Sequence, residues 1–153
     1  MKCNAPPADL PRRMCGTPTK SGLVLGSDLR QVGAARRWAA GATRSVPSLS
    51  RPVALVTSEL VTNALVHSAS GLPGGTVRVE LEHKPLHLVL SVTDNGPRPD
   101  QPLTFPTIPR LDPTRPGGNG LRLVEDAALY WEWDGCAGGP TTVLAFFERA
   151  TLL

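Results

Sequence analysis

The sequence predicts a two-layer α+β domain in which helices cover one face of a mixed, largely antiparallel sheet. Two observations support this prediction. Residues 76–82 alternate polar and apolar side chains, as a strand with one buried face does, and Lys84-Pro85 then forms a hairpin turn into a returning strand over residues 86–92. Residues 51–68 instead repeat apolar side chains at helical spacing, which indicates an amphipathic helix.

The N-terminal third contains three further features. Residues 1–20 hold four prolines and few periodic apolar residues, so we interpret them as a flexible tail. A short strand is expected at residues 23–25. Ser27 and Asp28 then offer N-cap chemistry for a first helix that ends near Gly41. The second helix is expected to begin around Arg51-Pro52, because proline is tolerated in a first turn.

The C-terminal part begins with an aperiodic segment. Residues 97–116 contain seven prolines, which suit neither a helix nor a central strand and favour disorder or a functional lid. A short helix over residues 121–128 and strands over residues 130–133 and 141–147 complete the domain. Residues 21–153 are therefore predicted to form a single domain, without an internal repeat.

Composition and charge exclude several classes of function. The net charge is +3, and the arginines are scattered without a basic stripe or recognition helix, so direct nucleic-acid binding is not expected. Three cysteines match no zinc spacing and are interpreted as isolated thiols. No apolar run approaches the roughly 20 residues of a membrane span, and no apolar segment follows Met1 as in a secretory signal. We therefore expect a cytoplasmic protein that does not bind membranes.

Three polar residues share one face of the second predicted helix. Glu59, Asn63 and His67 are spaced four apart, so their side chains project from the same side. An amide oxygen can ligate Mg²⁺, and a carboxylate beside it can orient or deprotonate a nucleophile. Taken alone, the Glu59–Asn63 pair fits a solvated helix face better. His67 fits a pocket and the exposed helix surface equally well.

A second cluster, Asp94-Asn95-Gly96, ends a predicted strand. These residue types are turn formers, which explains the cluster without any ligand. The functional interpretation is that Asp94 accepts a hydrogen bond from an adenine amino group, while Gly96 lets the backbone pass close to the base.

A third cluster is the loop Gly117-Gly118-Asn119-Gly120-Leu121 before a helix. Glycines free the backbone to wrap phosphate oxygens, and a helix N-terminus adds N–H donors. A flexible loop that enters a helix explains the pattern equally well. The loop is not a Walker A motif, because no Gly-Lys-Ser/Thr follows.

The order of these clusters carries a family resemblance. A helical E-x-x-x-N, a strand ending in D-x-G, a long lid and G-x-G-L opening a helix resemble the ATPase superfamily of gyrase, heat-shock chaperones, histidine kinases and mismatch-repair MutL. Within it, the segment ELVTNALVHS at residues 59–68 is most similar to the small bacterial anti-sigma-factor serine/threonine kinases. The resemblance covers residues 23–147.

This resemblance implies a Bergerat ATP-binding fold with ATP and Mg²⁺ as cofactors. Asn63 corresponds to the Mg²⁺ ligand, and Glu59 to the residue that acts as or positions the catalytic base. Asp94 corresponds to the adenine-reading residue, with Gly96 beside it. The positions that match the phosphate loop and an adenine-proximal threonine are Gly118, Asn119, Gly120, Leu121 and Thr142.

The implied reaction is transfer of the ATP γ-phosphoryl to a serine or threonine of an anti-sigma antagonist, with sequestration of a sigma factor as a further role. The alternative is a non-catalytic ATP-sensing module that regulates a protein partner. Asn119 stands where relatives commonly carry arginine, which favours the alternative modestly. A homodimer is left open.

Overall fold

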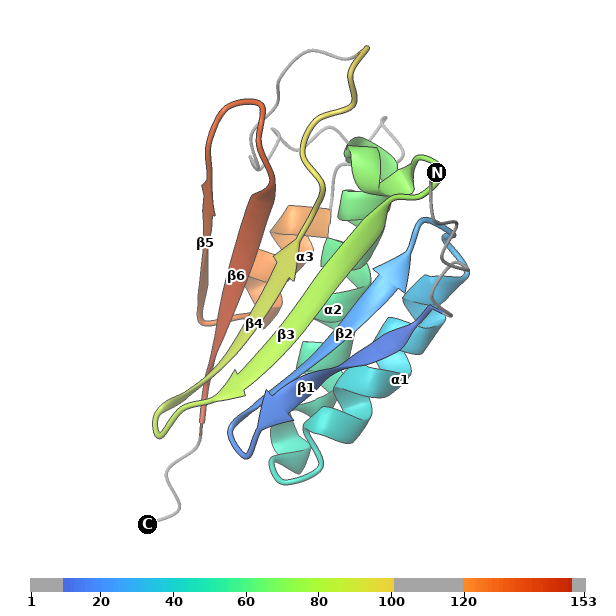
Figure 1. Cartoon of the computed structure of the whole chain (residues 1–153). Coiled ribbons are helices and arrows are strands. Elements are labelled where there is room, and N and C mark those ends of the chain that lie inside the picture. Colours follow the sequence, from blue (N-terminus) through green and yellow to red (C-terminus); the bar gives the residue numbers. More distant parts are fainter. Residues whose placement is uncertain (1–9, 101–119, 150–153) are drawn as a thin grey trace.

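The structure, a computed structural model, describes residues 10–100 and 120–149. Its centre is a six-stranded sheet in the order β1-β2-β3-β4-β6-β5, and every neighbouring pair is antiparallel (Figure 1). The strands are β1 (Arg12–Thr17), β2 (Lys20–Gly26), β3 (Thr76–His83), β4 (His87–Thr93), β5 (Tyr130–Gly135) and β6 (Thr141–Glu148). The expected antiparallel sheet is confirmed, and no parallel pair occurs among the described strands.

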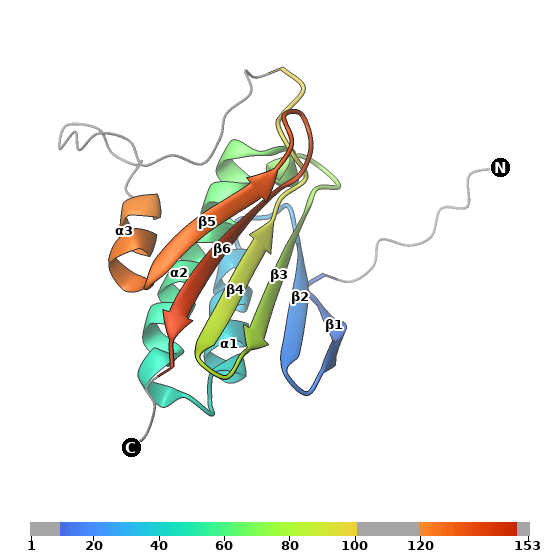
Figure 2. The same cartoon turned by 90° about the vertical axis from the view of Figure 1, so that its left-hand side faces the viewer.

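Three α-helices lie on one face of this sheet (Figure 2). They are α1 (Gln31–Ala42), α2 (Pro47–His67) and α3 (Gly120–Ala127), and the 3₁₀ turn η1 (Ala69–Gly71) follows α2. None of the described elements covers the opposite face, which confirms the two-layer α+β architecture. None of the helices within the described ranges combines the length and apolar character that a membrane span requires.

The core lies between the sheet and the helices. Every second side chain of β3 and β4 is buried, and the register places Val79 opposite Val92 and Leu81 opposite Leu90. Helix α2 covers this layer with the buried side chains of Val53, Val56, Leu60, Val61, Ala64 and Leu65. The buried residues Leu88, Leu90 and Val92 of β4 face the helices. Because side chains alternate along a strand, Asp94, two residues after Val92, lies on the same side of the sheet.

The N-terminal strand corrects one prediction. Residues 12–17, which the sequence assigns to a flexible tail through Lys20, form edge strand β1 paired with β2. All but one of its residues are exposed, so no alternation of buried side chains marks the strand in the sequence. Backbone hydrogen bonds to β2 define it instead. Residues 1–9 of the expected tail lie outside the described residues.

Two helix starts also differ from prediction. Helix α2 begins at Pro47, so Pro47 rather than Pro52 occupies the first turn, where a missing N–H leaves nothing unsatisfied. Helix α1 begins at Gln31, because the Asp28 carboxylate accepts the backbone N–H of Arg30 at 2.9 Å in a tight turn instead of capping the helix. The expected lid over residues 97–116 lies outside the described residues from position 101 onward.

Candidate functional site

Asp94 is fixed by the strand that neighbours it. Its backbone N–H donates to the carbonyl of Thr141 at 3.0 Å, and its Oδ1 accepts the N–H groups of Gly96 at 2.7 Å and Thr141 at 3.1 Å. Among the described residues, nothing donates to Oδ2. Asp94 is half-buried and lines a cavity. Its carboxylate therefore serves both as a turn former, through Oδ1, and as a free acceptor, through Oδ2.

Gly96 occupies a position that disfavours any side chain. Its φ of 90° is in the left-handed region that glycine adopts without strain. A Cβ at this position would lie 3.0 Å from the carbonyl oxygen of Gly139. The carbonyl of Gly96 accepts the N–H of Ala69 at 2.8 Å, which ties the turn to the end of α2. Gly96 thus lets the chain after β4 pass closely between α2 and the β5–β6 hairpin.

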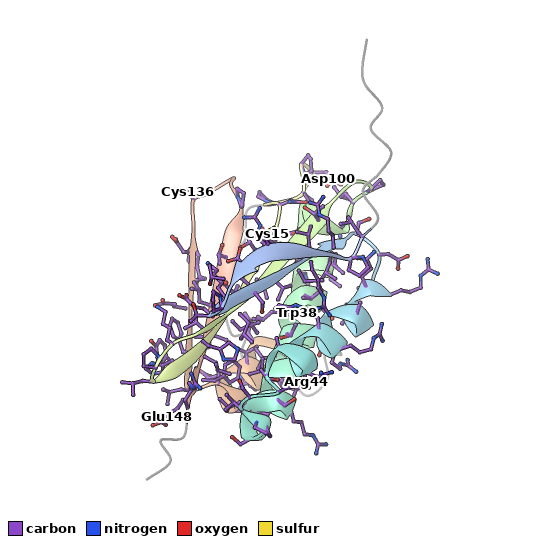
Figure 3. All side chains as sticks on the ribbon, turned by 60° about the horizontal axis from the view of Figure 1, so that its bottom comes forward. Cys15, Trp38, Arg44, Asp100, Cys136 and Glu148 are labelled. Atoms are coloured by element: carbon purple, nitrogen blue, oxygen red, sulfur yellow. The ribbon has the colours of Figure 1, made fainter. Side chains whose placement is uncertain are left out.

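A small cavity lies where these elements meet. Its lining comes from three places: the end of α2 (His67 and Ser68), the segment after β4 (Asp94, Gly96 and Pro97), and the β5–β6 turn with the start of β6 (residues 136–139 and Thr141). Cys136, at the tip of this turn, is labelled in Figure 3. The cavity measures about 40 Å³. This space admits a small chemical group rather than a whole nucleotide.

Helix α2 carries the three polar residues that the sequence singled out. Glu59 and Asn63 are half-buried, and His67 is exposed. Of the three, only His67 lines the cavity beside Asp94. Asn63 and then Glu59 follow on the same side of the helix toward its N-terminus, Asn63 at about 6 Å and Glu59 at about 12 Å of helical rise from His67. Within the described residues their side chains form no hydrogen bond, so both polar groups are available to a ligand.

A hydrogen-bond network that the sequence did not reveal closes the end of α2. Ser68 Oγ donates to the carbonyl of Ala64 at 2.6 Å and accepts the N–H of Ser70 at 3.0 Å, while Ser70 Oγ accepts the N–H of Asn95 at 2.9 Å. Both serine side chains are buried. The network joins α2 to the turn that carries Asp94, and it fixes the two sides of the cavity relative to each other.

Arg98 takes part in the same closure. Its guanidinium donates to the carbonyls of Ser68 at 3.0 Å and Leu65 at 3.1 Å, which are among the last carbonyls of α2. A cation at a helix C-terminus also interacts favourably with the helix dipole. Arg98 is therefore a helix cap and is not positioned as a phosphate ligand.

The predicted Thr142 does not line the cavity, and its neighbour Thr141 does. Thr142 pairs with Thr93 on the sheet face away from the helices, and their hydroxyl oxygens lie 2.8 Å apart. Thr141, on the helix-facing side, lines the cavity beside Asp94. Counting back by two from buried Phe147 and Ala145 gives Thr141, so the strand alternation contained the signal.

The glycine-rich loop is described only at its end. Helix α3 begins at Gly120, within one residue of the predicted start, and Leu121 packs against the core with buried Val124 one turn later. Leu121 is therefore a packing residue at the helix start. Gly118 and Asn119 lie outside the described residues. The chain thus places Asp94, Gly96 and His67 around one cavity, with Asn63 and Glu59 further along α2.

Comparison with known protein families assigns the chain to a family. The model of the histidine kinase-like ATPase domain family matches residues 25–145, which spans β2 to β6 and includes every site residue described above. No curated protein sequence matches closely enough to count as a relative. Because the match covers most of the chain, the protein belongs to the histidine kinase-like ATPase domain family, a family of ATP-binding modules.

Proposed function

We propose that this ATP-binding domain is a serine/threonine protein kinase that acts on a small anti-sigma antagonist and also sequesters a sigma factor. The observation that carries the proposal is the line of polar side chains on α2. Glu59 and Asn63 have no described hydrogen-bond partner, and they extend from the cavity that His67 shares with Asp94. A nucleotide held by its base at Asp94 therefore has a carboxylate and an amide along the path of its phosphates.

At the adenine end, Asp94 supplies the acceptor. Its Oδ2 takes a hydrogen bond from the exocyclic amino group, while Oδ1 remains bound to the N–H groups of Gly96 and Thr141. Gly96, which also lines the cavity, has no side chain that would block the base. This arrangement favours a purine that carries an amino donor.

At the phosphate end, the donor set of α2 suits a hard cation. The amide oxygen of Asn63 is the type of ligand that Mg²⁺ accepts alongside phosphate oxygens and water. When bound, Mg²⁺ neutralises charge on the phosphates. The first N–H groups of α3, which begins at Gly120, offer further donors for phosphate oxygens.

Glu59 completes the transfer. Its carboxylate accepts the proton of the substrate serine or threonine hydroxyl as the hydroxyl oxygen bonds to the γ-phosphorus. The bond between the γ-phosphorus and the bridging oxygen breaks, and ADP leaves. Asn63, one turn away, would hold the cation, so the helix positions the amide and the carboxylate together.

One observation supports the alternative of a non-catalytic ATP-sensing module. Arg98, which follows the turn at Asp94 to Gly96, donates to the carbonyls of Ser68 and Leu65, and position 119 of the glycine-rich loop is asparagine rather than arginine. Both features reduce the positive charge available to a transferring phosphoryl group. ATP would then act as a signal that changes how the domain binds its partner.

Phosphate transfer from γ-labelled ATP to candidate antagonist proteins separates the two functions. We expect Glu59→Gln to bind ATP with unchanged affinity and to transfer phosphate about 100-fold more slowly, since general-base catalysis contributes at least that factor. Glu132→Gln, an exposed glutamate on β5, is the matched control and should transfer at the wild-type rate. Tight ATP binding without transfer to any antagonist would favour the sensing module.

A further inference from the structure

A second and larger cavity lies at the other end of the sheet. It is an open groove of about 530 Å³ between the β1–β2 hairpin and α1, within the size range of ligand sites in proteins. Figure 3 shows the hairpin that carries Cys15 next to the helix that carries Trp38, with Arg44 after the end of that helix. None of the residues that line the groove belongs to the ATP site.

Arginines from both walls line the groove. Arg13 pairs with buried Leu23, so its side chain is on the helix-facing side of β1. On the facing wall, Arg37 lies on α1 and Arg44 in the turn that follows the helix, and both line the groove. Trp38, with 9% of its surface exposed, forms an apolar part of the wall. The groove thus combines three guanidinium groups with an aromatic surface.

The positive charge of the groove is not compensated. No acidic residue is among the described residues that line it, and within the described ranges the three arginines form no ion pair. Lys20, which also lines the groove, is different, because its ammonium group lies 2.9 Å from Glu80, whose hydrogen bond and charge raise the pKa of Lys20. The three arginines are consequently the groups available to an anion.

The groove also borders a free strand edge. β1 is the terminal strand of the sheet, so along its outer side alternate N–H and C=O groups have no partner strand among the described elements. Gly41 on the opposite wall leaves open space, since a Cβ there would meet no atom within 4 Å. An extended peptide is the ligand that uses both features, by adding a strand to β1 and filling the space toward α1.

We propose that this groove binds an extended acidic peptide segment of a protein partner, with carboxylates on alternate residues. Side chains of an added strand point to one face at every second position, so alternate carboxylates face Arg13, Arg37 and Arg44. Guanidinium groups bind carboxylates through paired hydrogen bonds, which suits this recognition. The site is independent of ATP binding and of the kinase proposal.

A synthetic peptide tests the proposal on the full chain. The probe is fluorescently labelled Glu-Thr-Glu-Thr-Glu-Thr, and the same peptide with glutamine for glutamate is the neutral control. At low salt we expect the acidic peptide alone to bind. Arg13→Gln, Arg37→Gln and Arg44→Gln should each weaken binding about fivefold or more, as loss of a charge-assisted hydrogen bond does. In NMR spectra, binding of the peptide should shift the backbone amide signals of β1 most.

Arg36→Gln is the matched control, because Arg36 is an exposed arginine on the same helix that does not line the groove. It should change the affinity less than twofold. Thermal unfolding and ATP binding verify that each variant remains folded. Absence of binding, equal loss in Arg36→Gln, or equal binding of the neutral peptide would overturn the proposal. So would tighter binding of inorganic triphosphate with the same arginine dependence, which would identify a small-anion site.

Discussion

Asp94 and Thr141 are joined by two hydrogen bonds between the end of β4 and the start of β6. The N–H of Asp94 donates to the Thr141 carbonyl at 3.0 Å, and Asp94 Oδ1 accepts the Thr141 N–H at 3.1 Å. This pairing orients the carboxylate before any ligand arrives, because Oδ1 accepts two backbone N–H groups and the residue lines the cavity. The structural role of Asp94 therefore rests on Oδ1, and substitutions can separate it from the proposed contact of Oδ2 with adenine.

Asp94→Asn should abolish tight ATP binding while preserving the fold. The amide oxygen can still accept the N–H groups of Gly96 and Thr141, but an NH₂ group then faces the amino group of adenine. Loss of a charge-assisted hydrogen bond is worth about 1.5–3 kcal/mol, so ATP affinity should fall by about 10- to 100-fold. Calorimetric titration with ATP and Mg²⁺ measures this.

Asp94→Ala is the comparison for that experiment. It removes both oxygens, so the N–H groups of Gly96 and Thr141 lose their acceptor, and the free energy of unfolding should decrease by about 1–3 kcal/mol in addition. Unchanged ATP affinity in either variant would refute the adenine assignment.

Gly96→Ala should destabilise the protein more than Gly138→Ala. Both glycines have positive φ, 90° and 83°, which costs an alanine about 1–2 kcal/mol. A Cβ at Gly96 would also lie 3.0 Å from the Gly139 carbonyl, whereas one at Gly138 meets no atom within 4 Å. We expect losses of about 2–4 and about 1 kcal/mol in urea unfolding. Equal losses would mean that the contact with Gly139 is relieved without cost.

Arg98→Gln should destabilise the end of α2. The substitution removes two hydrogen bonds to the carbonyls of Leu65 and Ser68 and a cation at the helix C-terminus, together worth about 1–3 kcal/mol. Arg36→Gln, on the exposed side of α1, should change stability by less than about 0.5 kcal/mol. If Arg98→Gln instead reduces ATP affinity at unchanged stability, Arg98 contacts the nucleotide and not the helix end.

Thr141→Val and Thr142→Val distinguish the two faces of β6. Only Thr141 lines the cavity, so Thr141→Val should weaken ATP binding by about 3- to 10-fold, the value of one neutral hydrogen bond. Thr142→Val should leave ATP affinity within twofold and lower stability by about 0.5–1.5 kcal/mol, because it loses the bond to Thr93. If Thr142→Val weakens ATP binding more than Thr141→Val does, then Thr142 and not Thr141 contacts the adenine.

The strong local periodicities explain which elements the sequence could predict. Residues 76–82 alternate with period two and residues 51–68 repeat with helical period, and each pattern reflects burial of one face in the structure. β1 has no buried face, so pairing with β2 alone defines it. Thr142 shows how a one-residue shift reverses the face of a strand residue.

The remaining parts of the site depend on contacts between distant segments. The turn at residues 136–139 contains no motif, yet the β5–β6 hairpin brings it against Gly96. The sequence gives no signal for the contact between Arg98 and α2, because its partners Leu65 and Ser68 lie 33 and 30 residues earlier in the chain. The motifs could therefore indicate which residues meet the ligand, but not which residues hold them in place.

Asn63→Leu should remove the dependence of ATP binding on Mg²⁺. In the proposed site the amide oxygen of Asn63 ligates the cation, so chelation of Mg²⁺ should weaken ATP binding to the wild type and leave the leucine variant unaffected. Asn63→Asp keeps an oxygen ligand and should retain the response, which controls for changes in packing on this half-buried face of α2. Titrations with ATP in Mg²⁺ and in a chelator give the ratio directly. A leucine variant that responds to Mg²⁺ like the wild type would show that another residue holds the cation. Glu59 would then be the first alternative ligand, because its carboxylate lies one turn along the same side of the helix.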